Sequence, residues 1–315
     1  MSEFAVTERP AAAGRVTVVG SINIDHVVVA AKFPSPGETI LGQQALVTLG
    51  GKGANQAVAA ALAGARVTMI GRVGADAEGE RARAGMARHG VDTSGVAVVD
   101  GVDTGTAWIT VAEQDNTIIV VSGANHRWPD SGNPLAGTPG SEDDVVLAQL
   151  EIPFGVVTRA AEACRGRFLL NAAPAAELPD ELIARCAVLI VNEHEQAVVA
   201  GLPEEDGIEA AHRRLRERGA GAVVTTLGPA GAVITDFDGS TARVPAIPAP
   251  EVVDTTGAGD AFAGVLAARL AAGDPLREAA RWASAAGSLA VRAPGAQESY
   301  PDRETLRRTV LGSPC

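Results

Sequence analysis

The sequence predicts an α/β fold of three layers, in which a mostly parallel central sheet carries helices on both faces. Short apolar, β-branched runs alternate along the chain with longer segments whose apolar residues recur at helical spacing. Hydrophobic residues make up 46% of the chain but aromatic residues only 3%. Small aliphatic side chains of this kind suit helices that pack closely on a buried parallel sheet.

The elements follow one another in a regular order. Helical patterns separate most of the strand-like runs, which favours parallel strands joined by crossover helices. Strands are predicted at residues 15–20, 66–71, 145–148, 168–170, 187–191 and 222–226. Helices are predicted at residues 53–62, 78–89, 153–164, 193–200 and 207–218, and again at 259–292 and 302–310.

Two stretches break this rhythm. Residues 27–50 and 96–121 read as strands joined by turns, without a convincing helix, which suggests a small β-sheet inserted into the larger domain. Such a sheet could act as a lid. A segment rich in Gly, Pro and Ser at residues 129–142 is expected to be an exposed connection. Residues 1–14 lack the pattern of a signal peptide and are expected to form a disordered tail before one domain at residues 15–312.

Charge and residue spacing exclude several classes of protein. The net charge is −12, from 26 Lys and Arg against 38 Asp and Glu, and there is no basic run, so nucleic-acid binding is not expected. No apolar run reaches membrane-spanning length, and we expect a cytoplasmic protein without a membrane partner. The five His show no HxxxH spacing and the three Cys no CxxC pair, which argues against a zinc site.

The most informative segment is residues 254–261, with the sequence DTTGAGDA. It precedes an apolar helical pattern, and free backbone N–H groups at a helix N-terminus attract phosphate. A phosphate alone would be ill served by Asp260. That carboxylate makes sense as the base that accepts a proton from a hydroxyl attacking the phosphate. The alternative is that Asp254, Thr255 and Asp260 are ordinary capping residues and the glycines only form a turn.

Two further segments offer polar groups that could contact a ligand. Asn23 and Asp25 follow the first strand and alternate to one side of an extended chain, where they could contact neighbouring hydroxyls; a capped turn is the alternative. Residues 50–56, GGKGANQ, let the main chain touch a ligand and offer Lys52 and Asn55 as polar groups. This segment lacks the spacing of a Walker A loop, and a glycine turn with a solvated lysine is the alternative. Glu151 is ambiguous by itself.

Two other features suit a nucleotide with its metal ion. Asn192 and Glu195 lie three residues apart on a predicted helix, so that their oxygens could reach Mg²⁺, directly or through water; the start of a surface helix is the alternative. Residues 226–231 could wrap the phosphates and ribose of a nucleotide or form only a hairpin turn.

Taken together and in order, five motifs resemble the ribokinase family of ATP-dependent carbohydrate kinases. The resemblance runs from about residue 15 to residue 301 and covers nearly the whole chain. The motifs are GSINIDH at 20–26, FPSPGETILG at 33–42, GGKGANQAVAAALAGA at 50–65, NAAPAAELPDEL at 171–182 and DTTGAGDAF at 254–262.

The resemblance implies a three-layer ribokinase-like fold and an ATP-dependent transfer of phosphate to the 5-hydroxyl of D-ribose. The alternatives are a kinase of another sugar or a nucleoside on the same fold, such as one acting on 2-deoxyribose, fructose or 2-keto-3-deoxygluconate, and a non-catalytic sugar- or nucleotide-binding regulator. Asp260 matches the general base, and the amides of Gly257, Ala258, Gly259 and Asp260 match the site that stabilises the transferring phosphoryl group. The matching sugar-site residues are Asn23, Asp25, Gly51, Lys52, Gly53, Asn55, Glu151 and Asp260.

The resemblance also implies ATP, Mg²⁺ and a monovalent cation, usually K⁺. Ser284 lies where relatives often carry a larger residue near the adenine, and Glu195 matches an acidic position associated with Mg²⁺. The remaining nucleotide positions are Asn192, Thr226, Leu227, Gly228, Gly231 and Gly259. The cation positions are Asp254, Thr256, Ala290, Ala293, Gly295 and Ser299. The inserted strands match a lid that closes over the sugar and forms a homodimer contact.

Overall fold

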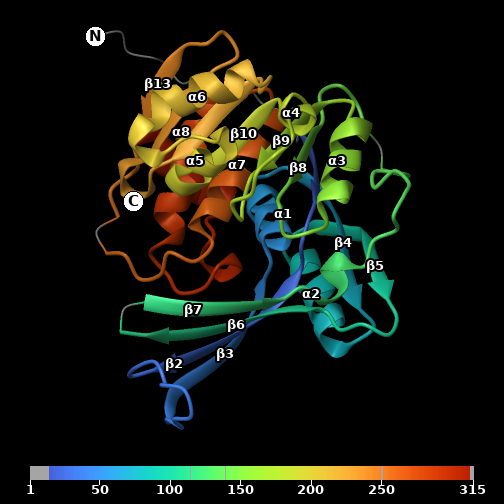
Figure 1. Cartoon of the computed structure of the whole chain (residues 1–315), viewed down its shortest axis with the longest axis vertical. Coiled ribbons are helices and arrows are strands. Elements are labelled where there is room, and N and C mark those ends of the chain that lie inside the picture. The colour runs from blue at the N-terminus through green and yellow to red at the C-terminus, as the bar shows by residue number, and fades with distance from the viewer. Residues whose placement is uncertain (1–13, 114, 139, 250, 313–315) are drawn as a thin grey trace.

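A nine-stranded sheet forms the centre of the molecule, and the computed structural model describes residues 14–113, 115–138, 140–249 and 251–312 (Figure 1). The strand order is β13-β12-β11-β10-β9-β8-β1-β4-β5. Strands β5 to β11 in this order are parallel, and only β12 runs against its neighbours. The strands are β1 (Arg15–Val19), β4 (Arg66–Gly74), β5 (Val91–Val99), β8 (Val145–Ala148), β9 (Arg167–Asn171), β10 (Val188–Asn192), β11 (Ala222–Thr226), β12 (Ala232–Thr235) and β13 (Thr241–Val244).

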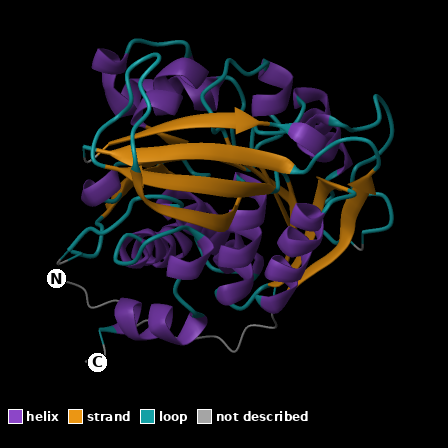
Figure 2. Ribbon diagram, turned by 90° about the horizontal axis from the view of Figure 1, so that it is seen from below, coloured by secondary structure: helices purple, strands orange, loops and turns teal. Residues whose placement is uncertain are grey.

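Helices cover both faces of this sheet, which confirms the predicted three layers (Figure 2). Alternate residues of one strand enter opposite cores: Val188 and Ile190 of β10 pack in one apolar cluster, whereas Leu189 and Val191 pack in the other. The first cluster includes residues of α1 (Lys52–Leu62), α2 (Ala77–Arg88), α7 (Ala258–Ala271), α8 (Leu276–Ala290) and α9 (Arg303–Leu311). The second includes residues of α3 (Phe154–Ala163), α4 (Asp180–Ile183), α5 (Glu193–Ala200) and α6 (Gly207–Glu217).

Small residues bring α1 and α7 into close contact. Gly264 of α7 lies against α1, where a Cβ atom would come 2.4 Å from the carbonyl oxygen of Gln56 and 2.8 Å from the Cβ of Ala59. Asp260 lies one helical turn before Gly264 and therefore faces α1 as well. The Ala- and Gly-rich composition thus has a local consequence, because it sets the distance between these two helices.

A separate four-stranded sheet projects from the lower end of the molecule in Figure 1. Its order is β3-β2-β6-β7, in which two antiparallel pairs are joined by the parallel pairing of β2 with β6. The strands are β2 (Asn23–Ala30), β3 (Gly42–Gly50), β6 (Gly105–Ala112) and β7 (Asp115–Val121).

The predicted limits of this small sheet need two corrections. Residues 96–99 belong to β5 at the edge of the large sheet, because β5 continues in parallel register along β4. The small sheet also starts earlier than residue 27, at Asn23. The sequence carries no local signal at these boundaries, because a sheet is defined by which strands pair and not by the residues of one strand.

The ends of the chain require one further correction. Most of the predicted tail lies outside the described residues, but Gly14 is part of the fold: its carbonyl oxygen accepts a hydrogen bond of 2.9 Å from the amide of Arg66. In the described part of the chain, no helix combines the length and the apolar character needed to cross a membrane.

Four short 3₁₀ helices complete the described structure: η1 (Gly123–His126), η2 (Glu204–Asp206), η3 (Gly228–Ala230) and η4 (Gln297–Ser299).

Candidate active site

The predicted site residues gather at the carboxyl edge of the large sheet. After β1 the chain adds strands on one side of it through β4 and later on the other side through β8, so the direction of winding reverses at β1. In open α/β sheets, ligands bind beyond the carboxyl ends of the strands at such a reversal. Asn192 and Thr226 end neighbouring strands in register, and the small sheet begins only three residues after β1.

Two glycines bring the start of α1 against the start of the small sheet. Gly51 has φ of 86°, and a Cβ atom there would lie 2.7 Å from the amide nitrogen of Asn23. At Gly50 a Cβ atom would lie 2.2 Å from both carboxylate oxygens of Asp25. The chain can pass here only without side chains. Asn23 and Asp25 therefore lie beside the glycine segment, and both are buried.

Glu151 reaches the same place from the other side. One of its carboxylate oxygens, Oε2, accepts hydrogen bonds from the amide of Lys52 at 3.0 Å and from the hydroxyl of Ser21 at 2.5 Å. Gly53 lies beside Ser21 as well, with its amide 3.3 Å from the Ser21 hydroxyl. These contacts join the end of β1, the start of α1 and the segment after β8.

Asp260 lies in the first turn of α7 and is 7% exposed. Its Oδ2 accepts a hydrogen bond of 3.0 Å from Nδ2 of Asn55, and its Oδ1 accepts one of 2.9 Å from Nε2 of Gln56. Gly257, the residue before the helix, has φ of 75°. The hydroxyl of Tyr300 donates to the carbonyl oxygen of Gly257 at 3.1 Å. This bond fixes the turn that precedes α7.

The charges in this region act strongly on one another. Burial, followed by the charges of Glu151, Asp260 and Glu298, raises the pKa of Asp25 to about 7. The Oδ1 atom of Asp25 is buried and has no hydrogen-bond partner. The carboxylate of Asp260 contributes most to a raised pKa of Lys52, whose ammonium group is the positive charge among these acids.

On the nucleotide side, Asn192 and Glu195 form a capping box. The Asn192 side chain accepts from the Glu195 amide at 2.7 Å, and Oε2 of Glu195 accepts from the Asn192 amide at 2.8 Å. The start of a helix, which the sequence left as an alternative, is therefore present. Burial raises the pKa of Glu195, and the Asn192 amide and the charge of Lys52 oppose this.

The segment 226–231 is a hairpin between β11 and β12, with η3 at its tip. Thr226 and Leu227 are half-buried, Gly228 is exposed and Gly231 is buried. Ser284 lies in α8, where its hydroxyl donates to the carbonyl oxygen of Pro245 at 3.0 Å. Residues 226–231 follow the carboxyl end of β11, whereas Ser284 lies beside the segment after β13 and already uses its donor within the protein.

The predicted cation positions lie in two segments, residues 254–256 and 290–299, and hydrogen bonds of Asp254 connect them. Its carboxylate accepts from the amide of Thr256 at 2.9 Å and from that of Gly295 at 2.9 Å. Although burial acts in the opposite sense, the hydrogen bonds hold the pKa of Asp254 below its ordinary value. Ala290 ends α8, Ala293 lies in the loop that follows it, and Ser299 ends the short helix η4. Among the described residues, no three His, Cys, Asp or Glu side chains form a metal cluster.

Several polar residues of the site escaped the sequence analysis. Asn125 donates to Oδ1 of Asn23 at 2.7 Å and accepts from the amide of Ile22 at 2.9 Å, so it orients the Asn23 side chain. The signal for Gln56 was its place directly after Asn55, and for Gln149 and Asn171 it was their places at strand ends. The other residues that the sequence analysis missed are Ser21, Gln297 and Tyr300.

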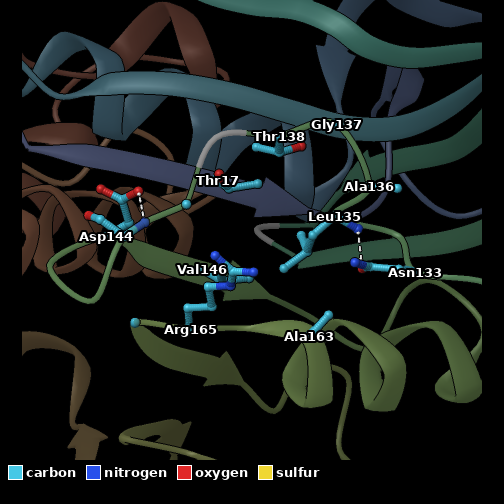
Figure 3. A pocket seen from close by; sticks show the side chains of 13 residues that line it. Thr17, Asn133, Leu135, Ala136, Gly137, Thr138, Asp144, Val146, Ala163 and Arg165 are labelled. Carbon is cyan, nitrogen blue, oxygen red and sulfur yellow. Dashed lines mark hydrogen bonds between the residues drawn. The ribbon is translucent and has the colours of Figure 1, made fainter.

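A cavity of about 390 Å³ lies elsewhere and is lined in part by residues within 133–138 and 140–141 (Figure 3). Asp144 and Gly166, which line it, precede β8 and β9 and mark the amino edge of the sheet. None of the predicted site residues lines this cavity. The position of the site therefore follows from the strand ends and not from the size of this cavity.

Comparisons with known proteins agree with this geometry. Residues 13–303 match the model of the pfkB family carbohydrate kinases. The chain is 38% identical over 310 residues to a ribokinase of Bacillus subtilis, with 94% of this chain and 99% of the relative covered. It is 36% identical over 299 residues to a ribokinase of Haemophilus influenzae, with 92% and 97% covered. A solved structure of Arabidopsis thaliana ribokinase complexed with ribose and ATP superposes with a TM-score of 0.85 at 32% identity and covers 95% of this chain and 99% of its own. The chain therefore belongs to the pfkB family of carbohydrate kinases.

Proposed function

We propose that this protein transfers the γ-phosphoryl group of ATP to the 5-hydroxyl of D-ribose, giving ribose 5-phosphate and ADP. The observation that carries the proposal is the place of Asp260, a buried carboxylate in the first turn of α7 that Asn55 links to the sugar-site segment. The relatives named above support ribose as the acceptor, because they are ribokinases and one of them was solved with ribose and ATP.

The sugar site suits a neutral molecule with many hydroxyl groups. In this proposal Asn23, Asp25, Gly51, Lys52, Gly53, Asn55 and Glu151 bind ribose. Carboxylates accept hydrogen bonds from hydroxyls more strongly than neutral groups do. The buried and unpartnered Oδ1 of Asp25 offers such an acceptor. Asn125 donates to Oδ1 of Asn23. The side-chain nitrogen of Asn23, Nδ2, therefore remains to donate to the sugar.

The chemical step needs a proton acceptor and a site for negative charge. Asp260 takes the proton of the 5-hydroxyl while that oxygen forms a bond to the γ-phosphorus and the bond from this phosphorus to ADP breaks. The amides of Gly257, Ala258, Gly259 and Asp260 lie at the start of α7, where a helix offers N–H groups without intrahelical partners; the Ala258 amide also makes a long bond of 3.3 Å to the carbonyl oxygen of Thr255. They stabilise the charge on the transferring group.

The nucleotide and its ions would lie beyond β10 and β11. We assign Asn192, Thr226, Leu227, Gly228, Gly231 and Ser284 to the nucleotide. Glu195 fits an indirect role toward Mg²⁺, because only one of its oxygens is held in the capping box. Mg²⁺ bound with ATP would offset the charge of the phosphates. The loops of Asp254, Thr256, Ala290, Ala293, Gly295 and Ser299 fit a monovalent cation such as K⁺, because the bonds of Asp254 bring them together.

The small sheet is assigned two roles, as a lid over the sugar and as a homodimer contact. Its strand register places Asp25, Ala107 and Val120 on one face, which is the face of the sugar site. The opposite face carries His26, Trp108 and Ile119, and the His26 and Trp108 rings stack at 4.4 Å. Exposed apolar side chains gather there, with Trp108 52% and Ile119 69% exposed. A second copy of the chain would cover this patch.

The experiment that tests the proposal measures ADP release with ribose, Mg²⁺ and ATP, with and without K⁺. We expect ribose to give the highest kcat/KM among candidate sugars and K⁺ to increase the rate. A deoxyribokinase of Salmonella typhi, 32% identical over 296 residues, makes 2-deoxyribose the second candidate acceptor. A clear preference for 2-deoxyribose, fructose or a nucleoside would overturn the assignment to ribose. A cytoplasmic location, where ATP is supplied, goes with the proposal.

A further inference from the structure

Side-chain amides hold both carboxylate oxygens of Asp260. Asn55 donates to Oδ2 and Gln56 donates to Oδ1. Each of these amides is held in turn by another: Nε2 of Gln297 donates to Oδ1 of Asn55 at 3.0 Å, and Nε2 of Gln149 donates to Oε1 of Gln56 at 2.6 Å. The carboxylate is thus the end point of two chains of hydrogen bonds that come from different parts of the sequence.

Close backbone contacts at two glycines fix the positions of Gln56 and Gln149. Gln56 and Gln149 are both 0% exposed. Gly20 makes room for Gln149, because a Cβ atom at residue 20 would lie 2.0 Å from Oε1 of Gln149. Gly264 lets α7 approach α1 at Gln56 itself. The distance from Gln56 to Asp260 is therefore set by glycine contacts between rigid elements.

The bonding pattern also fixes which end of the Gln56 amide faces the base. Its oxygen accepts from Gln149, and its nitrogen donates both to Asp260 and, at 2.9 Å, to Oδ1 of Asn171. A rotated amide would turn its oxygen toward the carboxylate and break the bonds to Gln149 and Asn171. The Gln56 amide therefore has one orientation, in which its nitrogen donates and the carboxylate of Asp260 accepts.

We propose that Gln56 is the positioning residue for the catalytic base, with Gln149 as its support. By binding Oδ1, Gln56 fixes the rotation of the Asp260 carboxylate, so that a free lone pair faces the 5-hydroxyl of the sugar. Turnover depends steeply on such alignment, because a displacement of about 1 Å can cost about a hundredfold in rate. This inference rests on the proposed function and adds a role for a residue that does not touch the substrate.

The test is a double-mutant cycle on the full chain with ribose and ATP. Gln56→Met keeps the length of the side chain and removes its N–H groups. We expect kcat to fall about tenfold to a hundredfold and KM for ATP to change less than about twofold. When Gln56→Met is added to Asp260→Asn, the residual kcat should fall less than about twofold further, because no base remains to be aligned.

A matched control separates alignment from the loss of any buried glutamine. Gln196 of α5 is 4% exposed, and its Oε1 accepts from the Thr225 hydroxyl at 2.9 Å, without a bond to Asp260. Gln196→Met should change kcat less than about twofold while it lowers the Tm by an amount similar to that of Gln56→Met.

Two outcomes overturn the inference. One is a double mutant whose kcat falls by the product of the two single effects, which would give Gln56 a structural role only. The other is a Gln56→Met enzyme with wild-type kcat. If that variant does not fold, Gln149→Met takes its place, with a smaller loss of kcat that must also vanish in the Asp260→Asn background. A wild-type protein that does not phosphorylate ribose would contradict the proposed function instead.

Discussion

Ribose capture should depend on pH through Asp25. The raised pKa of about 7 means that this carboxyl group changes its charge within the physiological range. In the proposed function its ionised form accepts hydrogen bonds from sugar hydroxyls through both carboxylate oxygens, whereas its protonated form has one acceptor fewer and no charge. At pH 8 about 90% of Asp25 is ionised and at pH 6 about 10%. We therefore expect kcat/KM for ribose to fall about tenfold between pH 8 and pH 6.

The assay is the initial rate at low ribose and saturating ATP, measured at closely spaced pH values. Asp25→Asn provides the comparison, because an amide keeps the shape of the side chain but does not titrate. This variant should have a lower kcat/KM at pH 8 and should lose the tenfold change. The reasoning is refuted if wild-type kcat/KM stays constant from pH 8 to pH 6, or if Asp25→Asn retains the full wild-type slope.

Four further predictions follow from single contacts. Asp260→Asn should lower kcat by about a hundredfold to ten-thousandfold with KM for ribose nearly unchanged, and wild-type turnover would exclude a base role. Burial lowers the pKa of His212 to about 4. The contribution of this residue to stability is therefore present above pH 6.5 and is lost as the pH falls, because the unfolded chain then binds the proton more strongly. Urea unfolding should show a loss of about 2 kcal/mol between pH 7.5 and pH 5, and His212→Gln should lack this loss. In the proposed homodimer Ile119 lies at the contact, so Ile119→Asp should lower the mass in light scattering from that of a dimer to that of a monomer; a monomeric wild type would contradict the proposed dimer, and a dimer unchanged by the substitution would locate its contact elsewhere. Gly264→Val should cost about 1–3 kcal/mol in thermal unfolding and lower kcat, because its Cβ collides with α1; a stability equal to wild type would contradict the close packing.

The sequence alone predicted those strands of the large sheet that have a local signal. The runs that became β1, β8, β10 and β11 are apolar, β-branched and bounded by turns, so period and propensity agree. The pattern was insufficient for β5, in which buried and exposed residues do not alternate regularly. That strand is defined by its pairing with β4 and not by its own composition.

The residues of the candidate site also divide into those with a local sequence pattern and those without one. Asp260 and the glycines around it were visible because a helix start beside a carboxylate is a local pattern. The bonds from Gln56 and Asn125 were not visible, since they join residues 204 and 102 positions away along the chain. Neutral amides carry no sequence signal that separates a buried network from an exposed surface, and only the packing of α1 against α7 gives Gln56 its partner.

The arrangement of charges gives a physical reason for the two halves of the site. The protein carries a net charge of −12, and the proposed sugar site concentrates the carboxylates of Asp25, Glu151 and Asp260 around Lys52. Such a site attracts hydroxyl donors and repels free phosphate. An anionic nucleotide must therefore be held where helix termini and cations outweigh that field. In the proposed function the phosphoryl group would meet the sugar at the start of α7, where the base and amides without intrahelical partners lie together. This separation favours transfer to the sugar over binding of a phosphate in its place.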